Sequence, residues 1–231
     1  MLITLHDQEF ILLPQKAMYW KSQEAILIAD AHFGKATHFR KHGIYISEKP
    51  FENDLEILFQ LITEFKPKKI LFLGDMFHSL YNEECVAFKN LIDNFPFLQT
   101  ILIKGNHDIL KPVDYEALNI QLVNRLLIDG VLIVHEQSEV ENKAESKKKV
   151  ETYGENPITS QIPIITICGH IHPAYELKGR GRQHIRLACF HLSNQIFTLP
   201  AFGSFTGHHS ISPQEEDNVF IISGTEILKI N

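Results

Sequence analysis

The chain has 231 residues and a net charge of −6, from 22 Lys and Arg against 28 Asp and Glu. Its 44% apolar and 22% charged residues are ordinary for a globular protein and exclude a disordered or fibrous chain. At about 150 residues per domain, a single domain over residues 1–231 is the simplest organisation. Because the net charge is negative, a phosphate-bearing partner would need a local basic patch or a metal ion. The unusual count is histidine, because the 13 His outnumber the 12 Gly.

The cysteines and the N-terminus indicate the compartment. The three Cys are widely spaced and form no Cys-x-x-Cys pair, which favours small buried side chains over disulfides or a zinc–thiolate site. The first residues lack the basic and apolar segments of a signal peptide, and no run of about 18 apolar residues occurs. We therefore expect a cytoplasmic protein without a membrane segment.

Short apolar runs that end in polar clusters recur along the chain. Five of them are typical of buried strands, at 26–30, 70–75, 100–108, 131–135 and 164–170. Apolar residues at helical spacing predict helices at 51–65 and 82–95. Strands that alternate with helices indicate a layered α/β fold. Beyond His172, apolar residues alternate with polar ones and predict further strands at 185–192, 195–199, 219–222 and 227–230.

The segment 137–161 has a different composition. It is rich in Lys and Glu and poor in apolar residues. Such a composition is typical of a flexible, solvated insertion, with a short exposed ion-paired helix as the alternative. We therefore interpret residues 137–161 as a flexible, charged insertion in the domain.

Polar side chains follow each of the five predicted strands. The motifs are Asp-x-His, Gly-Asp-x-x-His, Gly-Asn-His-Asp, a single His and Gly-His-x-His, and their nitrogen and oxygen donors are Asp30, His32, Asp75, Asn106, His135, His170 and His172. In open α/β sheets ligands bind beyond the carboxyl ends of the strands, so these clusters can converge at one edge. Residues two apart on an extended segment point the same way and can hold one ion.

These donors predict a metal centre. Seven ligands are too many for one tetrahedral ion, whereas two ions that share a carboxylate fit the set. Mixed nitrogen and oxygen donors without thiolate favour Mn, Fe or Zn over Ca or Mg, and Mn is our first choice. A single Asp-x-His motif is more often a chance pair of surface residues than a metal site. Five such clusters in this order are not explained by chance. Two bound divalent cations would polarise a phosphoryl oxygen and lower the pKa of a shared water.

The ordered motifs between residues 29 and 173 resemble those of the calcineurin-type metallophosphoesterases. Further segments resemble a narrower group, the bacterial DNA-ligase-associated damage-response metallophosphoesterases, which are endonucleases; these segments are 34–40, 74–79, 169–174, 177–183 and 199–207. The resemblance implies a four-layer αββα sandwich of two mixed sheets flanked by helices. It also implies a phosphodiesterase that cleaves DNA during repair, beside ligase-, helicase- and exonuclease-type proteins.

The resemblance also implies roles for single residues. One metal would be held by Asp30, His32, Asp75 and His172, and the second by Asp75, Asn106, His135 and His170, with Asp75 as the bridge. His107 would stand beside the metals, where it would stabilise the transition state or protonate the leaving oxygen, with Asp108 orienting its imidazole. The alternative for His107 is a ligand or a packing residue. His78 resembles a site residue of repair nucleases, and its alternative is a hydrogen-bonding neighbour of the ligands.

Basic residues near these motifs predict the substrate path. The candidate substrate-binding residues are Lys35, Arg40, Arg180, Arg182 and His208. The segment 178–186 alternates basic residues with others and contains two Gly, which is typical of a nucleic-acid-binding loop or of a solvated hairpin. DNA is the partner that the resemblance implies. A small nucleotide-like phosphodiester is the alternative substrate, and a non-catalytic scaffold that has lost its ligands is the alternative class.

Overall fold

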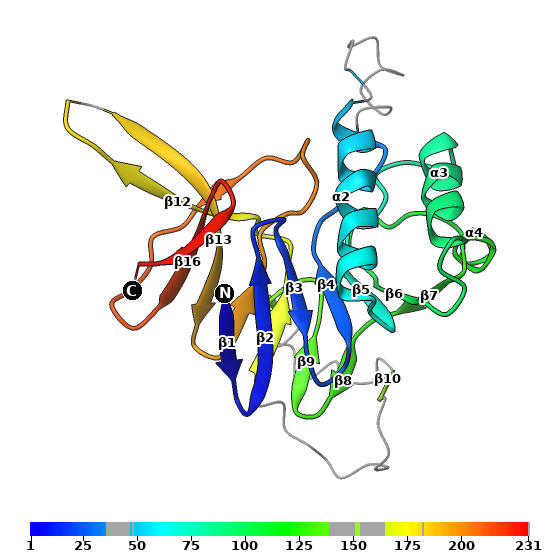
Figure 1. Cartoon of the computed structure of the whole chain (residues 1–231), viewed down its shortest axis with the longest axis horizontal. Coiled ribbons are helices and arrows are strands. Elements are labelled where there is room, and N and C mark those ends of the chain that lie inside the picture. The colour runs from blue at the N-terminus through cyan, green and yellow to red at the C-terminus, as the bar shows by residue number, and fades with distance from the viewer. Residues whose placement is uncertain (36–46, 48, 139–150, 153–164, 182, 231) are drawn as a thin grey trace.

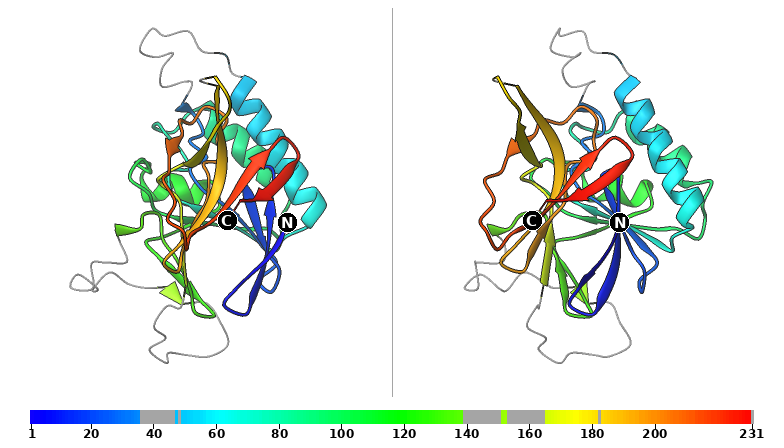
Figure 2. Two further views of the ribbon diagram at one scale, coloured as in Figure 1. Left: turned by 90° about the vertical axis from the view of Figure 1, so that its left-hand side faces the viewer. Right: turned by 60° about the vertical axis from the view of Figure 1, so that its left-hand side comes forward.

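The computed structural model describes residues 1–35, 47, 49–138, 151–152, 165–181 and 183–230. Two mixed β-sheets face each other, and helices cover the outer face of the first sheet (Figure 1). In Figure 2 the blue strands of the first sheet and the gold and red strands of the second form two separate layers.

The first sheet contains seven strands in chain order. They are β1 (Leu2–Leu5), β2 (Gln8–Leu13), β3 (Ala17–Trp20), β4 (Ala25–Ile28), β5 (Lys69–Leu73), β6 (Gln99–Ile103) and β7 (Ile120–Val123). The pairs from β1 to β4 are antiparallel, and the pairs from β4 to β7 are parallel. The carboxyl ends of β4, β5 and β6 therefore lie at one edge.

The second sheet contains ten strands in the described part of the chain. They are β8 (Leu126–Ile128), β9 (Val131–Ile133), β10 (Glu151–Thr152), β11 (Ile165–Cys168), β12 (Pro173–Lys178), β13 (His184–Ser193), β14 (Ile196–Thr198), β15 (His209–Ser210), β16 (Asn218–Ser223) and β17 (Glu226–Lys229). Strand β11 is parallel to both of its neighbours, β9 and β14. Strands β12 and β13 form a hairpin that projects from the body of the molecule (Figure 1).

Three helices pack on the first sheet: α2 (Lys49–Phe65), α3 (Glu83–Ile92) and α4 (Pro112–Ala117). Helix α2 ends just before Lys66-Pro67, because a residue that precedes proline disfavours helical backbone. The N-cap of α3 is Asn82, whose side chain accepts a hydrogen bond from the Cys85 N–H at 3.2 Å.

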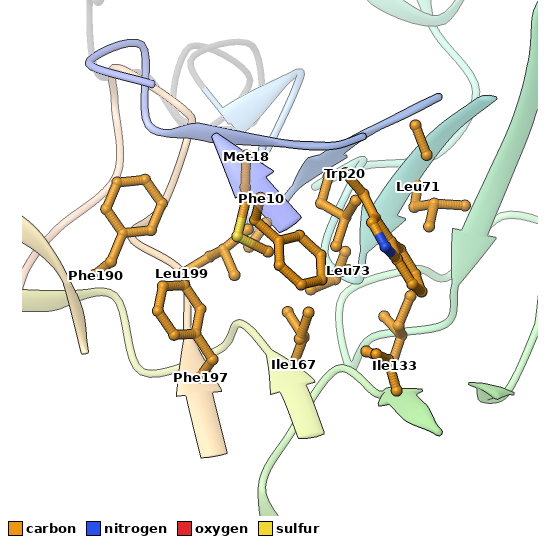
Figure 3. Packing of buried hydrophobic residues seen from close by; sticks show 14 of the residues in the cluster. Phe10, Met18, Trp20, Leu71, Leu73, Ile133, Ile167, Phe190, Phe197 and Leu199 are labelled. Carbon is orange, nitrogen blue, oxygen red and sulfur yellow. The ribbon is translucent and has the colours of Figure 1, made fainter. Parts of the chain in front are cut away.

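The main core lies between the two sheets. Aromatic and aliphatic side chains from both sheets interdigitate there, as Figure 3 shows for Phe10, Trp20, Ile133, Phe190 and Phe197. The rings of Phe10 and Trp20 lie 5.2 Å apart, and both residues are fully buried. A second cluster fills the space between the first sheet and the three helices. These two clusters fix the strand ends that carry the polar motifs.

The two mixed sheets confirm the predicted fold class, and the predicted strands and helices are present. Helices α2, α3 and α4 all cover the first sheet, and none of these three covers the outer face of the second. Most of the predicted insertion 137–161 lies outside the described residues; within it, β10 pairs with β8. No helix in the described part of the chain is both long and apolar enough to cross a membrane.

Candidate metal centre

The five polar motifs meet where the carboxyl ends of the two sheets come together. Asp30 follows β4, Asp75 follows β5 and the loop 105–108 follows β6, while His135 follows β9 and His170 follows β11. The sheets are joined at this edge because Ala29 forms a parallel bridge with Ala201, which lies after β14. The sequence expectation that distant clusters converge is therefore met.

The first donor group consists of Asp30, His32 and His172. One ligand atom from each lies within 4.8 Å of the others. The Nε2 atom of His172 is 3.3 Å from Oδ1 of Asp30. Oδ1 of Asp30 and Nε2 of His32 are buried and have no hydrogen-bond partner. Because buried polar atoms are normally paired, these two atoms fit a metal ion as the missing partner.

The second donor group consists of Asp75, His135 and His170, whose ligand atoms also lie within 4.8 Å of one another. The Nε2 atom of His135 is 3.5 Å from Oδ1 of Asp75 and 3.1 Å from Nδ1 of His170. Asp75 and His135 are almost fully buried, and His170 is half-buried. The group therefore has one partly open side.

Asp75 lies between the two donor groups. Its Oδ1 approaches His135, and its Oδ2 is 3.9 Å from Nε2 of His32 in the first group. One carboxylate thus presents an oxygen to each group, as a ligand shared by two ions does.

Backbone carbonyls orient two of the imidazoles. Nδ1 of His135 donates to the Leu73 carbonyl at 2.9 Å, and Nδ1 of His172 donates to the Gly207 carbonyl at 3.1 Å. In the neutral form of each ring, this leaves the Nε2 atom available to a metal. Burial lowers the pKa of His32 to about 2, so this imidazole is also neutral.

The backbone at the site is strained. Five of the predicted ligands have positive φ: Asp30 (52°), His32 (46°), Asp75 (49°), His170 (70°) and His172 (54°). Residues with side chains rarely adopt this region, and such outliers gather at functional sites. The strain is local: Asp30, Asp75 and His170 each lie two residues after the end of a strand, and His32 and His172 each lie two residues further on.

Glycines allow the ligands to lie close to the backbone. A Cβ atom on Gly74 would lie 2.1 Å from Nδ1 of His135, and one on Gly105 would lie 2.3 Å from Oδ1 of Asp75. A Cβ atom on Gly169 would lie 2.5 Å from Oδ2 of Asp30. Any larger residue at these three positions would therefore clash with a ligand side chain, so the motifs require Gly there.

His107 and His78 lie beside the donor groups. The His107 side chain is 52% exposed, and its Nε2 is 4.0 Å from Oδ2 of Asp75. Its ring centre lies 4.5 Å from that of His78. Nδ1 of His78 is 3.3 Å from Nδ1 of His32. Both rings thus line the open side of the centre.

The structure corrects the role expected for Asp108. Its carboxylate accepts the backbone N–H groups of Asp75 and Gly105 at 2.8 Å and of Met76 at 2.9 Å. The carboxylate is almost fully buried beneath the site. It therefore fixes the backbone that carries Asp75, and it does not orient the His107 imidazole.

The other predicted residues lie in several places. Asn106 is exposed in the loop between Gly105 and His107. Burial lowers the pKa of His208, and the nearby charges of Lys16 and Arg186 lower it further. Lys35 is half-buried close to His32, and Arg180 is exposed at the tip of the β12–β13 hairpin. Arg40 and Arg182 lie outside the described residues.

Two residues that support the site were not predicted. Asp54 on α2 binds Ser204, in the loop 202–208 that crosses the site. Gly207 in the same loop supplies the carbonyl for His172. No local sequence pattern predicts either contact, because the two partners are far apart along the chain.

Two mixed sheets with paired Asp/His donor groups at their carboxyl edge define a metal-dependent phosphoesterase. A model of the calcineurin-like phosphoesterase family matches residues 25–209, and the chain belongs to this family. The structure of Pseudomonas putida nuclease MPE is similar over 99% of each chain, with 27% identity and a TM-score of 0.71. The Escherichia coli phosphoesterase Yfce is also similar, at 11% identity and a TM-score of 0.40, over 89% of this chain and 97% of that one. No curated protein matches the sequence.

Proposed function

We propose that this protein is a dinuclear metal-dependent phosphodiesterase that cleaves DNA. The observation that carries the proposal is the position of Asp75, with one carboxylate oxygen toward each donor group. The similarity to a Pseudomonas putida nuclease along nearly the whole chain supports a nucleic acid as the substrate, and we take DNA because the motifs resemble those of the DNA-ligase-associated enzymes. A role in bacterial DNA repair, beside ligase-, helicase- and exonuclease-type proteins, is part of the same proposal.

The metals would be held by the two donor groups already described, with Asn106 as an additional oxygen donor. When bound, two divalent cations polarise the phosphoryl oxygen and lower the pKa of a water between them. The ligands combine imidazole with carboxylate and amide oxygen and include no thiolate, a set that favours Mn, Fe or Zn, and Mn is our first choice.

His107 is the proposed general acid. It lies on the open side of the centre, within 4.0 Å of the shared carboxylate but outside both donor groups. Its backbone N–H donates to Oδ1 of Asp75 at 2.8 Å, which fixes the loop position relative to the metals. The exposed ring can give a proton to the leaving oxygen of the diester. His78, packed against it, would position the ring.

The β12–β13 hairpin is the proposed path for the DNA backbone. It begins directly after the ligand His172, and its cross-strand pairs place Lys178, His184 and Arg186 on one face, with Glu176 on the same face opposite Arg186. These three residues are exposed. Ala188 lies on the same face and belongs to the core between the sheets, so the basic face is on the inner side of the sheet. A local basic path of this kind offsets the net charge of −6.

The catalytic part of the proposal is tested with Asp75→Asn on bis-p-nitrophenyl phosphate and Mn²⁺. Asp93→Asn, on the exposed end of α3, is the matched control. We expect kcat/KM to fall about a thousandfold or more in Asp75→Asn, because several kcal/mol of transition-state stabilisation are lost. The control should retain the wild-type value. Full activity in Asp75→Asn would refute a shared carboxylate.

The substrate is tested with single-stranded and nicked circular DNA over a series of salt concentrations. We expect cleavage with Mn²⁺ and binding that weakens as salt rises, because phosphate contacts release counterions. Hydrolysis of small diesters without cleavage of any DNA would instead identify a small phosphodiester as the substrate. Mn²⁺ binding without hydrolysis of either class would identify a scaffold.

A further inference from the structure

A cavity of about 420 Å³ lies on the outer face of the second sheet, beside the metal centre. Its floor is formed by β13 and β14. Phe190 and Phe197 of these strands point into the core between the sheets, so their neighbours His191 and Ile196 point outward into the cavity. The volume is in the range of about 300–1,000 Å³ that is usual for pockets that bind small molecules.

The cavity shares one wall with the metal centre. Ile171 and Pro173 line the cavity, and they flank His172, a ligand of the first donor group. His209 lines the cavity as well, and its backbone N–H donates to the His172 carbonyl at 2.9 Å. The segment 171–173 is therefore the part of the chain between the cavity and the first donor group. A substrate whose phosphate lies at the metals can therefore extend a neighbouring group over this segment.

The chemistry of the lining indicates what that group is. Among the described residues that line the cavity there is no Lys, Arg, Asp or Glu, and the ionisable side chains of the lining are His191 and His209. Four aliphatic residues form apolar walls: Ile171, Pro173, Ile196 and Ile211. Between them, Asn194 and Ser212 offer both donors and acceptors of hydrogen bonds. Apolar walls with polar edges suit a flat, neutral heterocycle.

One polar group of the lining is held in a fixed orientation. Nε2 of His191 is 2.9 Å from Oδ2 of Asp217, which is 6% exposed. The hydroxyl of Ser193 and the backbone N–H of Gln214 donate to the same carboxylate. Because Nε2 of His191 is engaged, Nδ1 is the ring atom left for a ligand. Such a preorganised group is typical of a built binding site.

We propose that this cavity binds the base of a nucleotide next to the scissile phosphodiester. The inference rests on the proposed function, since it names a subsite for the same substrate. The metal centre holds the phosphate, and the cavity holds the adjacent base through apolar contacts and hydrogen bonds to its edge. An unstacked base of single-stranded DNA can reach the cavity, whereas a paired base cannot.

The variant Ile196→Trp tests the subsite, because a larger side chain fills the cavity while the His191–Asp217 pair stays intact. Leu127→Trp is the matched control. Both residues are half-buried and pack against the same small cluster on the outer face, but Leu127 does not line the cavity. The substrates are a single-stranded oligonucleotide and an oligonucleotide of the same length in which abasic residues replace the nucleotides.

We expect Ile196→Trp to lower kcat/KM for the base-bearing oligonucleotide by about tenfold or more. It should leave the abasic substrate unchanged, and Leu127→Trp should change neither. An equal loss on both substrates would mean that the substitution damages the centre as a whole, and no loss on either would mean that the base lies elsewhere. Either result overturns the inference.

Binding of a neutral nucleoside to the metal-free protein separates this inference from the proposed function. We expect thymidine or adenosine to shift amide NMR signals of β13 and β14 in the wild type and in Leu127→Trp, but not in Ile196→Trp. If the wild type cleaves no diester, the proposed function fails and this titration alone decides the subsite. Shifts that persist in Ile196→Trp, or no shifts in the wild type, would overturn it.

Discussion

The carboxylate of Asp54 on α2 binds Ser204, 150 positions further along the chain. It accepts the Ser204 backbone N–H at 3.0 Å and the Ser204 hydroxyl at 2.5 Å. Asp54 is only 4% exposed. This contact ties the loop 202–208 to the helix layer, and the same loop supplies the carbonyl that orients His172. A residue remote from the metals thus determines how one ligand is presented.

Asp54→Ala should weaken the first donor group more than the second. The Ser204 N–H would lose its acceptor, and because Ser204 is exposed, water can replace that acceptor, so the loss costs about 0.5–1.5 kcal/mol of unfolding free energy. We expect one Mn²⁺ to bind with reduced affinity in a calorimetric titration while the other is retained. Ser22→Ala, which removes an exposed hydroxyl in the turn between β3 and β4, is the control. Equal affinities in Asp54→Ala and the wild type would contradict the positioning role.

Asp108→Ala should destabilise the fold as well as the site. Its carboxylate accepts several buried backbone N–H groups, which would be left without partners. We expect a loss of at least about 2 kcal/mol in urea unfolding. Asp93→Ala, which removes an exposed carboxylate paired with Lys89, should lose less than about 1 kcal/mol. Similar losses in the two variants would show that Asp108 does not support the backbone.

His107→Ala should separate catalysis from metal binding. The ring lies outside both donor groups, so the metal content should stay at the wild-type value. We expect kcat to fall by about two orders of magnitude or more, as for the loss of a general acid. Elemental analysis of the dialysed protein checks the metal, and hydrolysis of bis-p-nitrophenyl phosphate checks the rate. A metal content that falls together with the rate would make His107 a ligand.

The three cysteines should be unreactive in the native protein. All three are buried, and burial raises the pKa of the Cys85 thiol to about 11 and that of the Cys189 thiol to about 12. The reactive thiolate is therefore scarce at about pH 8 and increases as the pH rises. We expect slow labelling by a disulfide reagent at that pH and fast labelling in urea. Fast labelling of the folded protein would contradict their place in the core.

The sequence predicted the metal centre because its geometry follows from the strands. Parallel strands of one sheet end at a shared edge, so the donors after β4 and β5 lie together, and so do those after β9 and β11. The bridge between Ala29 and Ala201, which brings the edges of the two sheets together, has no such signal in the sequence. Apolar periodicity predicted strands that alternate with helices in a layered α/β fold, and the resemblance to the metallophosphoesterases implied the two mixed sheets. The hairpin of β1 and β2 was missed, because its alternating residues lie between polar turns and outside the longer apolar runs.

Support from distant residues could not be predicted from the sequence. Asp54 and Ser204 are ordinary polar residues in their own segments, and only the folded chain brings them together. For Asp108, the sequence suggested a partner that the folded chain does not use. It is adjacent to His107 in the sequence, but its side chain turns toward the backbone of Asp75. Sequence adjacency therefore gave the wrong partner for this carboxylate.

Metal stoichiometry tests the central claim most directly. The wild type and Asp75→Asn are dialysed against Mn²⁺ and analysed for bound metal per chain. A centre built from two donor groups around one carboxylate predicts two ions in the wild type and fewer than two in Asp75→Asn. A single ion in the wild type, or two ions held with unchanged affinity in Asp75→Asn, would contradict it.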